Sequence, residues 1–296
     1  MSQATLDLIV SLDVLISVAI GSVLVFIVIG WAAIKHRSLD NGGLLIVGSA
    51  IVALVVTGRA PVPVWMVLGL VLLAAAGWVP TKTIATRMLT LIPGAAAIGA
   101  SFLDSPQLAL GAFVVVAIVL SGPFVAGFDE RYRESAISTP LMAVSLLGAF
   151  VTIPDTDVAV IAAAAAVPWV FTGPPAKLVV LGRAGAFAAT GFLVWVVASG
   201  GFSRSDALIT GVATLALLIA EPAVRLFRSA ERTRLDRFLA TGLSGAVVIV
   251  VAQGVIVLIL GQVIGGTVLS AVYAGVLAVA LLAIAGIWAT TPKPDG

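Results

Sequence analysis

Eleven long apolar segments follow one another along this chain, and short clusters of glycine, proline and charged residues separate them. They cover residues 7–34, 43–57, 64–79, 88–103, 108–127, 138–153, 158–172, 183–199, 207–223, 238–260 and 267–289. A helix that crosses a hydrocarbon layer of about 30 Å needs roughly 20 mainly apolar residues, within a range of about 17–25. The pattern predicts an all-α integral membrane protein, a single domain over residues 1–296 with 10 or 11 transmembrane helices, and 11 is the preferred count.

The composition indicates that lipid is the solvent for most of the chain. Hydrophobic residues make up 61% of its 296 residues and charged residues only 10%, whereas soluble domains carry about 25% charged residues. A soluble fold of this length has too much surface to hide so many apolar side chains. The net charge of +2 comes from cations scattered between apolar segments, so it does not indicate nucleic-acid binding. The absence of cysteine excludes disulfides and thiolate metal sites.

The basic residues sort to one side when the segments alternate in direction and the N-terminus lies outside. Of 16 lysines and arginines, only Arg59 and Arg204 then lie outside. The other 14 lie inside: Lys35, Arg37, Lys82, Arg87, Arg131, Arg133, Lys177, Arg183, Arg225, Arg228, Arg232, Arg234, Arg237 and Lys293. Because cytoplasmic loops are enriched in Lys and Arg, this predicts a multi-pass protein of the cell membrane with its C-terminus in the cytoplasm.

Two features of this topology have alternatives. The start of the chain has no basic region before a long apolar segment, so we expect a retained spanning helix rather than a cleaved signal peptide. The short segments within 43–79 either span twice or form a re-entrant hairpin in a nine-helix protein, and both fit the charge sorting. We prefer two spans, because a hairpin buries Arg59.

The segments after the first one divide into two groups of five. Residues 1–42 hold the first helix and a basic loop, residues 43–153 the first half, and residues 154–296 the second half. An odd number of helices in each half gives the halves opposite orientations, as in the inverted repeats of many transporters. An inverted repeat is therefore one hypothesis for this chain.

Six tryptophans fall at or near the predicted ends of the apolar segments: Trp31, Trp65, Trp78, Trp169, Trp195 and Trp288. Amphipathic indole rings gather at the headgroup level of membranes. We interpret them as an anchoring belt rather than a ligand cage.

Few residues are suited to catalysis. The only histidine, His36, lies between two cations and lacks partners for a metal site or a catalytic triad. We therefore expect no metal, no cofactor and no catalytic residue, and an enzyme is the less favoured class.

A substrate path, if the chain has one, is predicted from polar and helix-breaking residues inside the apolar segments. Asp13 shares a helix face with Ser17 and Gly21, which predicts that this stripe faces the bundle or water. Gln253 lies in the middle of a segment, where it either bridges helices by hydrogen bonds or lines a path. Prolines are expected to interrupt backbone bonding. The candidates are Asp13, Ser17, Pro93, Ser121, Pro123, Pro168 and Gln253.

The longest polar stretch, residues 221–237, is predicted to be a cytoplasmic surface helix. Its arginines are expected to contact lipid headgroups or dock a protein partner: Arg225, Arg228, Arg232, Arg234 and Arg237. Glu221 is expected to pair with Arg225, four residues later at an interface.

Three classes of function follow from these features. The first is a secondary transporter or permease for a small solute, indicated by helix number and interrupted helices. The second is a non-catalytic membrane subunit or scaffold of a larger complex. The third is a lipid-processing enzyme that uses Asp129, Glu130, Arg131 and Arg133 at the inner interface, with a solvated, self-neutralising loop as the plainer interpretation.

Overall fold

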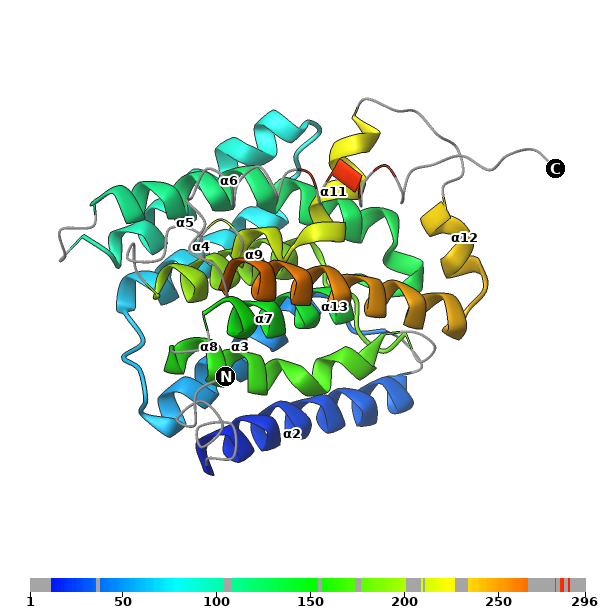
Figure 1. Cartoon of the computed structure of the whole chain (residues 1–296), viewed down its shortest axis with the longest axis horizontal. Helices are drawn as coiled ribbons and strands as arrows, with labels where there is room; N and C mark the ends of the chain where they lie inside the picture. The colour runs from blue at the N-terminus through cyan, green and yellow to red at the C-terminus, as the bar shows by residue number, and fades with distance from the viewer. Residues whose placement is uncertain are drawn as a thin grey trace.

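The structure is a computed structural model, and its regular elements are helices wherever it describes the chain (Figure 1). The described residues are 12–35, 38–103, 108–153, 156–173, 177–200, 209, 211–226, 234–265, 280, 283, 284 and 287. The α-helices are α2 (Leu12–Lys35), α3 (Gly42–Thr57), α4 (Val64–Trp78), α5 (Ile84–Ala100), α6 (Leu108–Arg131), α7 (Ser138–Thr152), α8 (Asp157–Ala166), α9 (Arg183–Ala198), α11 (Ala216–Arg225), α12 (Arg234–Ala240) and α13 (Leu243–Gly265). Two short 3₁₀-helices are η1 (Arg133–Ser135) and η2 (Val167–Thr172).

These helices lie where the apolar segments predicted them, and local chemistry sets their ends. Gly58 closes α3 in a left-handed conformation, with φ 64°, that glycine adopts without steric cost. Thr83 opens α5 with a capping box, in which its side chain accepts the Thr86 N–H. The last predicted segment, 267–289, and His36 lie outside the described residues apart from four isolated positions in that segment.

The number of membrane spans is not confirmed at 11. In the described part of the chain, two helices are long and apolar enough to cross a membrane, namely α2 and residues 109–131 of α6. The helices α3, α4, α5, α7 and α9 are also apolar but only 15–17 residues long. The apolar segments that predicted these helices are themselves only 15–17 residues long, because breaker and polar residues flank them.

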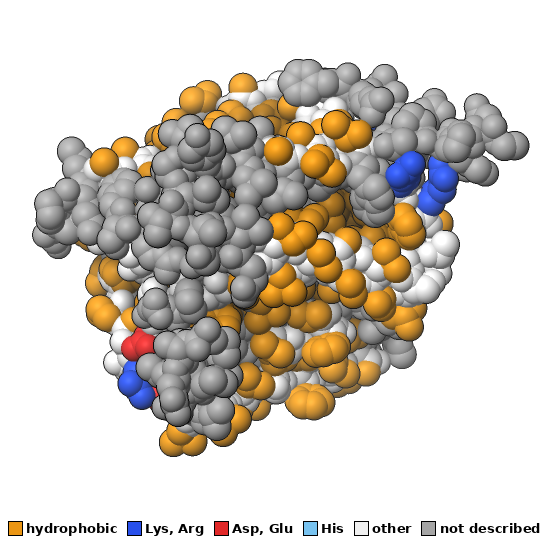
Figure 2. Space-filling model, in the orientation of Figure 1, with side chains coloured by type: hydrophobic (Ala, Val, Ile, Leu, Met, Phe, Trp, Pro, Cys, Tyr) orange, Lys and Arg blue, Asp and Glu red, His pale blue; other side chains and the backbone are white. Residues whose placement is uncertain are grey.

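The long helices α2, α6 and α13 run in roughly the same direction through the bundle (Figure 1). Figure 2 shows acidic and basic side chains near the start of α2, basic side chains over α12 at the other end, and mainly hydrophobic side chains between them. The large exposed hydrophobic side chains include Phe26, Val55, Leu89 and Val251, each more than half exposed. Such a surface is unfavourable in water and matches the side of a bundle that faces an apolar solvent.

Helix α9 forms the centre of the bundle. All its residues from Ala184 to Ala198 are buried, and it packs against α3, α4 and α6. Small residues let these backbones approach closely: a Cβ on Gly43 would lie 2.3 Å from the carbonyl oxygen of Gly185. Because glycine has no side chain, it lets the two helix backbones lie in direct contact at this crossing.

The packing of the two predicted halves differs. Helix α4 packs closely along α5, and α5 along α6. The corresponding helices of the second half are α9, α11 and α13; α11 touches α13 only lightly, and α9 with α11 is not among the closely packed pairs of described helices. The inverted repeat stays a prediction, and this packing does not favour it.

The predicted tryptophan belt is compatible with the exposure of some tryptophans and not with that of others. Trp31, Trp65 and Trp78 are exposed, as a belt requires. Trp169 is fully buried and donates its indole N–H to the Ser49 hydroxyl over 3.2 Å, and Trp195 is also buried, so the belt interpretation is wrong for these two. Trp288 lies outside the described residues.

The prolines interrupt the helices at one of three predicted positions. Helices α5 and α6 continue through Pro93 and Pro123, so the expected interruption does not occur there. A single proline removes one N–H donor, and the neighbouring turns keep the helix intact. At Pro168 the α-helical α8 does give way to the 3₁₀-helix η2.

We expect Gly21→Ala to destabilise the protein by about 1–3 kcal/mol, because a Cβ there would lie 2.3 Å from the Ala165 carbonyl oxygen and overpack α2 against α8. Gly30→Ala on the same helix is the matched control, since a Cβ at Gly30 meets nothing within 4 Å. Alanine there should be neutral or slightly stabilising. Melting temperatures in detergent compare the two variants, and equal melting temperatures would contradict the packing of α2 on α8.

Candidate functional site

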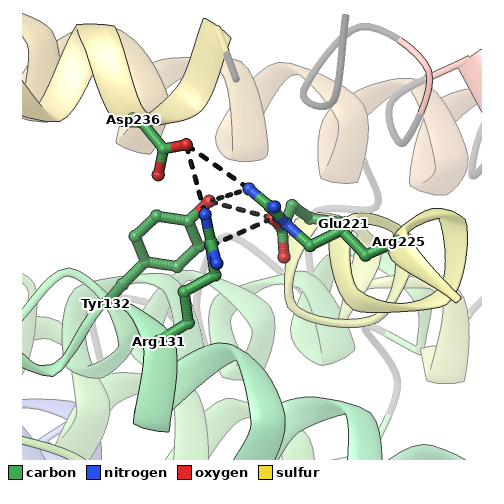
Figure 3. A network of polar contacts seen from close by, with 5 residues as sticks. All are labelled: Arg131, Tyr132, Glu221, Arg225 and Asp236. Atoms are coloured by element: carbon green, nitrogen blue, oxygen red, sulfur yellow. Dashed lines mark hydrogen bonds and ion pairs between the residues drawn. The ribbon is translucent and has the colours of Figure 1, made fainter. Parts of the chain in front are cut away.

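Polar side chains form two clusters, one buried and one partly buried, where α6, α7, the chain around α11, α12 and α13 meet. The central cluster consists of Ser145 of α7, Thr214 and Gln253 of α13. The charged cluster consists of Arg131 and Tyr132 at the end of α6, Glu221 and Arg225 of α11, and Asp236 of α12 (Figure 3). Thr214 and Glu221 are seven residues apart, which corresponds to roughly 10 Å along a helix.

The central cluster lies at a break in the helical chain. Residues 211–213 are helical, Thr214 and Leu215 form a turn, and α11 then begins at Ala216. The start of α11 has no side-chain cap of its own. The first backbone N–H groups of any helix lack intrahelical partners, so this break exposes polar backbone inside the bundle.

Gln253, on the neighbouring helix α13, forms hydrogen bonds with the backbone groups at this break. Its Oε1 accepts the Leu217 N–H over 3.2 Å, and its Nε2 donates to the Thr214 carbonyl over 2.5 Å and to the Ser145 hydroxyl over 3.1 Å. The Ser145 hydroxyl also lies 2.8 Å from the Thr214 carbonyl. Gln253 and Ser145 are fully buried. These contacts are those of a helix bridge, the first of the two roles considered for Gln253.

The charged cluster is organised around the fully buried Glu221 (Figure 3). Tyr132 donates its hydroxyl to Glu221 Oε1 over 2.9 Å, and Arg225 donates to the same oxygen. The predicted i, i+4 pair of Glu221 with Arg225 is therefore confirmed, although Glu221 lies inside the protein rather than at an exposed interface. Its second oxygen, Oε2, is buried without a hydrogen-bond partner among the described residues.

Two arginines connect Glu221 to α12. The nearest side-chain nitrogens of Arg131 and Arg225 each lie 3.4 Å from Asp236 Oδ2. Burial raises the pKa of Tyr132, and the negative charges of Glu221 and Asp236 raise it further. Burial lowers the pKa of Arg225, but the hydrogen bond to Glu221, the negative charge of Glu221 and the contact with Tyr132 together outweigh burial and raise it. The phenol therefore stays protonated and the guanidinium charged at any physiological pH.

The charged residues that follow Phe128 do not converge on one point. Asp129 is fully buried, where it accepts the Ser138 hydroxyl and, over 2.9 Å, the Gly182 N–H. Glu130 bridges Arg87 and Arg183 at 2.9 and 2.7 Å.

The loop before α3 contacts two other parts of the chain, the loop after α6 and the segment before α9. Arg133 pairs with Asp40 at 2.5 Å. The backbone of Leu39 pairs with residues 178–180, where its N–H donates to the Leu178 carbonyl over 2.8 Å and its carbonyl accepts the Val180 N–H over 2.9 Å. Glu130 and Arg133 thus pair with residues of other elements rather than with each other, and the pair of Arg133 with Asp40 stays about half exposed.

The remaining candidates for a substrate path are dispersed. Asp13 pairs with Arg59 at 2.5 Å near the start of α2, and Ser17 is buried, as the predicted stripe requires. Ser121 is buried and donates to the Ala117 carbonyl of its own helix over 2.5 Å. Pro93 is exposed on the outside of α5. Gln253 differs from these residues, because its side chain bonds polar groups of two other helices, the Ser145 hydroxyl of α7 and the Leu217 N–H of α11.

Sequence reasoning missed Ser145, Thr214, Tyr132 and Asp236. A lone hydroxyl residue in an apolar segment was the available signal for Ser145 and Thr214. That signal is weak, because such hydroxyls commonly bond their own helix backbone. Of the basic residues predicted to dock lipid or protein, Arg225 is committed to the charged cluster, Arg228 and Arg232 lie outside the described residues, and Arg234 and Arg237 flank a surface cavity.

Comparisons with known proteins do not identify a relative: no protein-family model matches this chain, and no curated protein matches it.

Proposed function

We propose that this chain is a multi-pass integral membrane protein of the cell membrane that acts as a permease for a small, uncharged or weakly polar solute. In this proposal each of the 11 apolar segments crosses the membrane, and flanking residues complete the span of the shorter helices. The protein would need no cofactor.

The distribution of charge supports the membrane part of the proposal. Each ion pair between described residues joins residues of the same predicted side: Arg59 with Asp13 outside, and the remaining pairs inside. The two groups lie at opposite ends of the bundle, with an apolar surface between them (Figure 2). This is the arrangement that a low-dielectric layer requires, because unpaired charge within it is costly.

The membrane proposal predicts which loops face the outside of the cell. The chain has no cysteine, so single cysteines placed at the exposed positions Pro61 and Ser38 report on one loop each. A membrane-impermeant maleimide added to intact cells should label Pro61→Cys and not Ser38→Cys, and permeabilised cells should label both. Labelling of Ser38→Cys in intact cells would reject the proposed orientation, and recovery of the protein in the soluble fraction would reject the membrane proposal.

The broken helix at Thr214 and Leu215 is the observation that supports transport. Discontinuous helices supply backbone donors and acceptors for solutes near the middle of many transporters. Here the Thr214 carbonyl, the Leu217 N–H, the Ser145 hydroxyl and the Gln253 amide lie together and bond one another. A small solute with a hydroxyl or amide group that took the place of the Gln253 side chain would bind the same donors and acceptors. None of these groups is charged, so the site suits an uncharged solute.

A solute screen tests the permease proposal. The purified protein is heated in detergent with a panel of sugars, polyols, neutral amino acids and ions, because a ligand of the folded state raises the melting temperature. Each solute that does so is then tested for counterflow in proteoliposomes. Counterflow that is lost in Gln253→Leu and kept in Gly254→Ala supports the proposal. If no solute raises the melting temperature or exchanges across the membrane, the permease proposal is wrong.

A non-catalytic subunit of a larger complex is the second candidate. The observation in its favour is that Gln253 uses its amide oxygen and its amide nitrogen within the protein, which suits a static bundle. A stoichiometric partner that co-purifies from mild detergent, together with a negative solute screen, would favour this candidate. The lipid-processing alternative has less support, because Asp129, Glu130 and Arg133 point to separate structural partners.

A further inference from the structure

The corner between α12 and α13 carries a cavity with positive charge on its wall. The cavity measures about 350 Å³ and is lined by Arg234, Arg237, Phe238 and Thr241. Gly242, with φ 76°, turns the chain between the two helices. Gly245 packs so closely under the Phe238 carbonyl that a Cβ there would overlap it, so the corner is tightly built.

The two arginines of this cavity have no counter-ion among the described residues. Neither forms an ion pair there, and Nη2 of Arg237 is buried without a hydrogen-bond partner. Asp236, between them in the sequence, is directed instead toward Arg131 and Arg225 (Figure 3). A partly buried guanidinium group without an acceptor is unfavourable, and an anion in the cavity would relieve this cost. Guanidinium groups bind phosphate particularly well, because their N–H donors match its oxygens.

An apolar stripe leads away from the same cavity along α13. It consists of exposed side chains at helical spacing: Leu243, Val247, Val251, Val255 and Leu258, each about half exposed. The stripe runs over 16 residues, from Leu243 to Leu258, or about 22 Å of helix, which exceeds half of a hydrocarbon layer about 30 Å thick. The cavity with the two arginines is therefore next to an apolar stripe, as the phosphate of a phospholipid is next to its acyl chains.

We propose that the α12–α13 corner binds an anionic phospholipid, with its phosphate between Arg234 and Arg237 and an acyl chain along the α13 stripe. The proposal rests on the membrane part of the proposed function, since both arginines then lie at the inner surface, where anionic lipids attract basic residues. A free phosphate ion would use the arginines but not the stripe. An acidic peptide would leave the stripe uncovered.

The test measures lipid binding to the purified full-length protein in detergent. Native mass spectrometry counts bound molecules of phosphatidylglycerol and phosphatidylcholine, and melting temperatures are recorded with each lipid and with inorganic phosphate. The protein should retain phosphatidylglycerol in preference to phosphatidylcholine and should melt at a higher temperature with it. The double variant Arg234→Gln/Arg237→Gln should bind phosphatidylglycerol at least about tenfold more weakly, since two charge-assisted contacts are lost.

The control variant is Arg133→Gln, which removes the same charge from the same predicted face. Its guanidinium already pairs with Asp40, so lipid binding should not change. If the double variant does not fold, the single variants Arg234→Gln and Arg237→Gln are compared instead, and each should lose part of the affinity.

Two results would overturn the proposal. One is equal binding of phosphatidylglycerol by the wild-type protein and by the folded arginine variants. The other is stabilisation by inorganic phosphate at the same concentration as large as that by the lipid, which would identify a site for a free anion. The cysteine labelling described above is a separate measurement, so a normal topology without lipid selectivity rejects the lipid site alone.

Discussion

Replacing Gln253 by leucine is expected to destabilise the protein by about 2–4 kcal/mol. Leucine keeps the volume of the side chain but removes three hydrogen bonds, to Ser145, Thr214 and Leu217. Hydrogen bonds between helices in membranes are individually modest. The larger part of the loss should come from the Leu217 N–H, which is left buried without an acceptor at the start of α11. The midpoint of unfolding in SDS and the melting temperature in detergent measure the change.

Gly254→Ala is the matched control for Gln253→Leu. It changes the next residue of the same helix, and a Cβ at Gly254 meets nothing within 4 Å. Its effect should be within about 1 kcal/mol and is more often stabilising, because alanine favours the helix. If the two variants unfolded at the same midpoint, the bridge between α7, α11 and α13 would not contribute to stability.

Replacing Glu221 by alanine should destabilise the protein by about 3 kcal/mol. The substitution leaves Arg225 partly buried without its closest counter-ion and leaves the Tyr132 hydroxyl without its acceptor. Removing one partner of a buried pair costs about 3–5 kcal/mol, and the lower value applies because Arg225 keeps Asp236 at 3.4 Å. The same unfolding measurement in SDS detects the loss.

The comparison variant for Glu221→Ala is Asp13→Asn, which breaks the pair with Arg59 at the other end of the bundle. The side chains of Arg59 and Asp13 are 48% and 20% exposed, so solvent screens much of this interaction and the loss should not exceed about 1 kcal/mol. A Glu221→Ala effect as small as that of Asp13→Asn would show that the charged cluster does not hold α6, α11 and α12 together.

Much of the fold was predictable from the sequence. The apolar segments predicted the positions of the described helices within a few residues at most ends, because apolar length and breaker residues act locally. They did not predict how many helices are long enough to span a membrane. Breakers such as Gly58 and Pro63 bound the helices where they bound the apolar segments, so the segments 43–57 and 64–79 give helices of only 16 and 15 residues.

The candidate site was predictable only in part. Gln253 was a candidate because an amide in the middle of an apolar segment requires partners. Its partners Ser145 and Thr214 are 108 and 39 residues away in the chain. The pair of Glu221 with Arg225 was predictable from its spacing, but Tyr132, 89 residues from Glu221, was not.

The sequence alone determined that this chain forms a series of apolar helices with basic residues sorted between them, because helix periodicity, apolar length and charge are properties of neighbouring residues. Only the tertiary structure decided which polar groups meet: Gln253 with a broken backbone, Glu221 with Tyr132, and Asp129 with Gly182. It also decided that Arg234 and Arg237 stay without partners among the described residues while Asp236 turns away from them. Such contacts depend on how helices cross, and crossing is set by close-packed small residues such as Gly43 and Gly185 rather than by any local pattern.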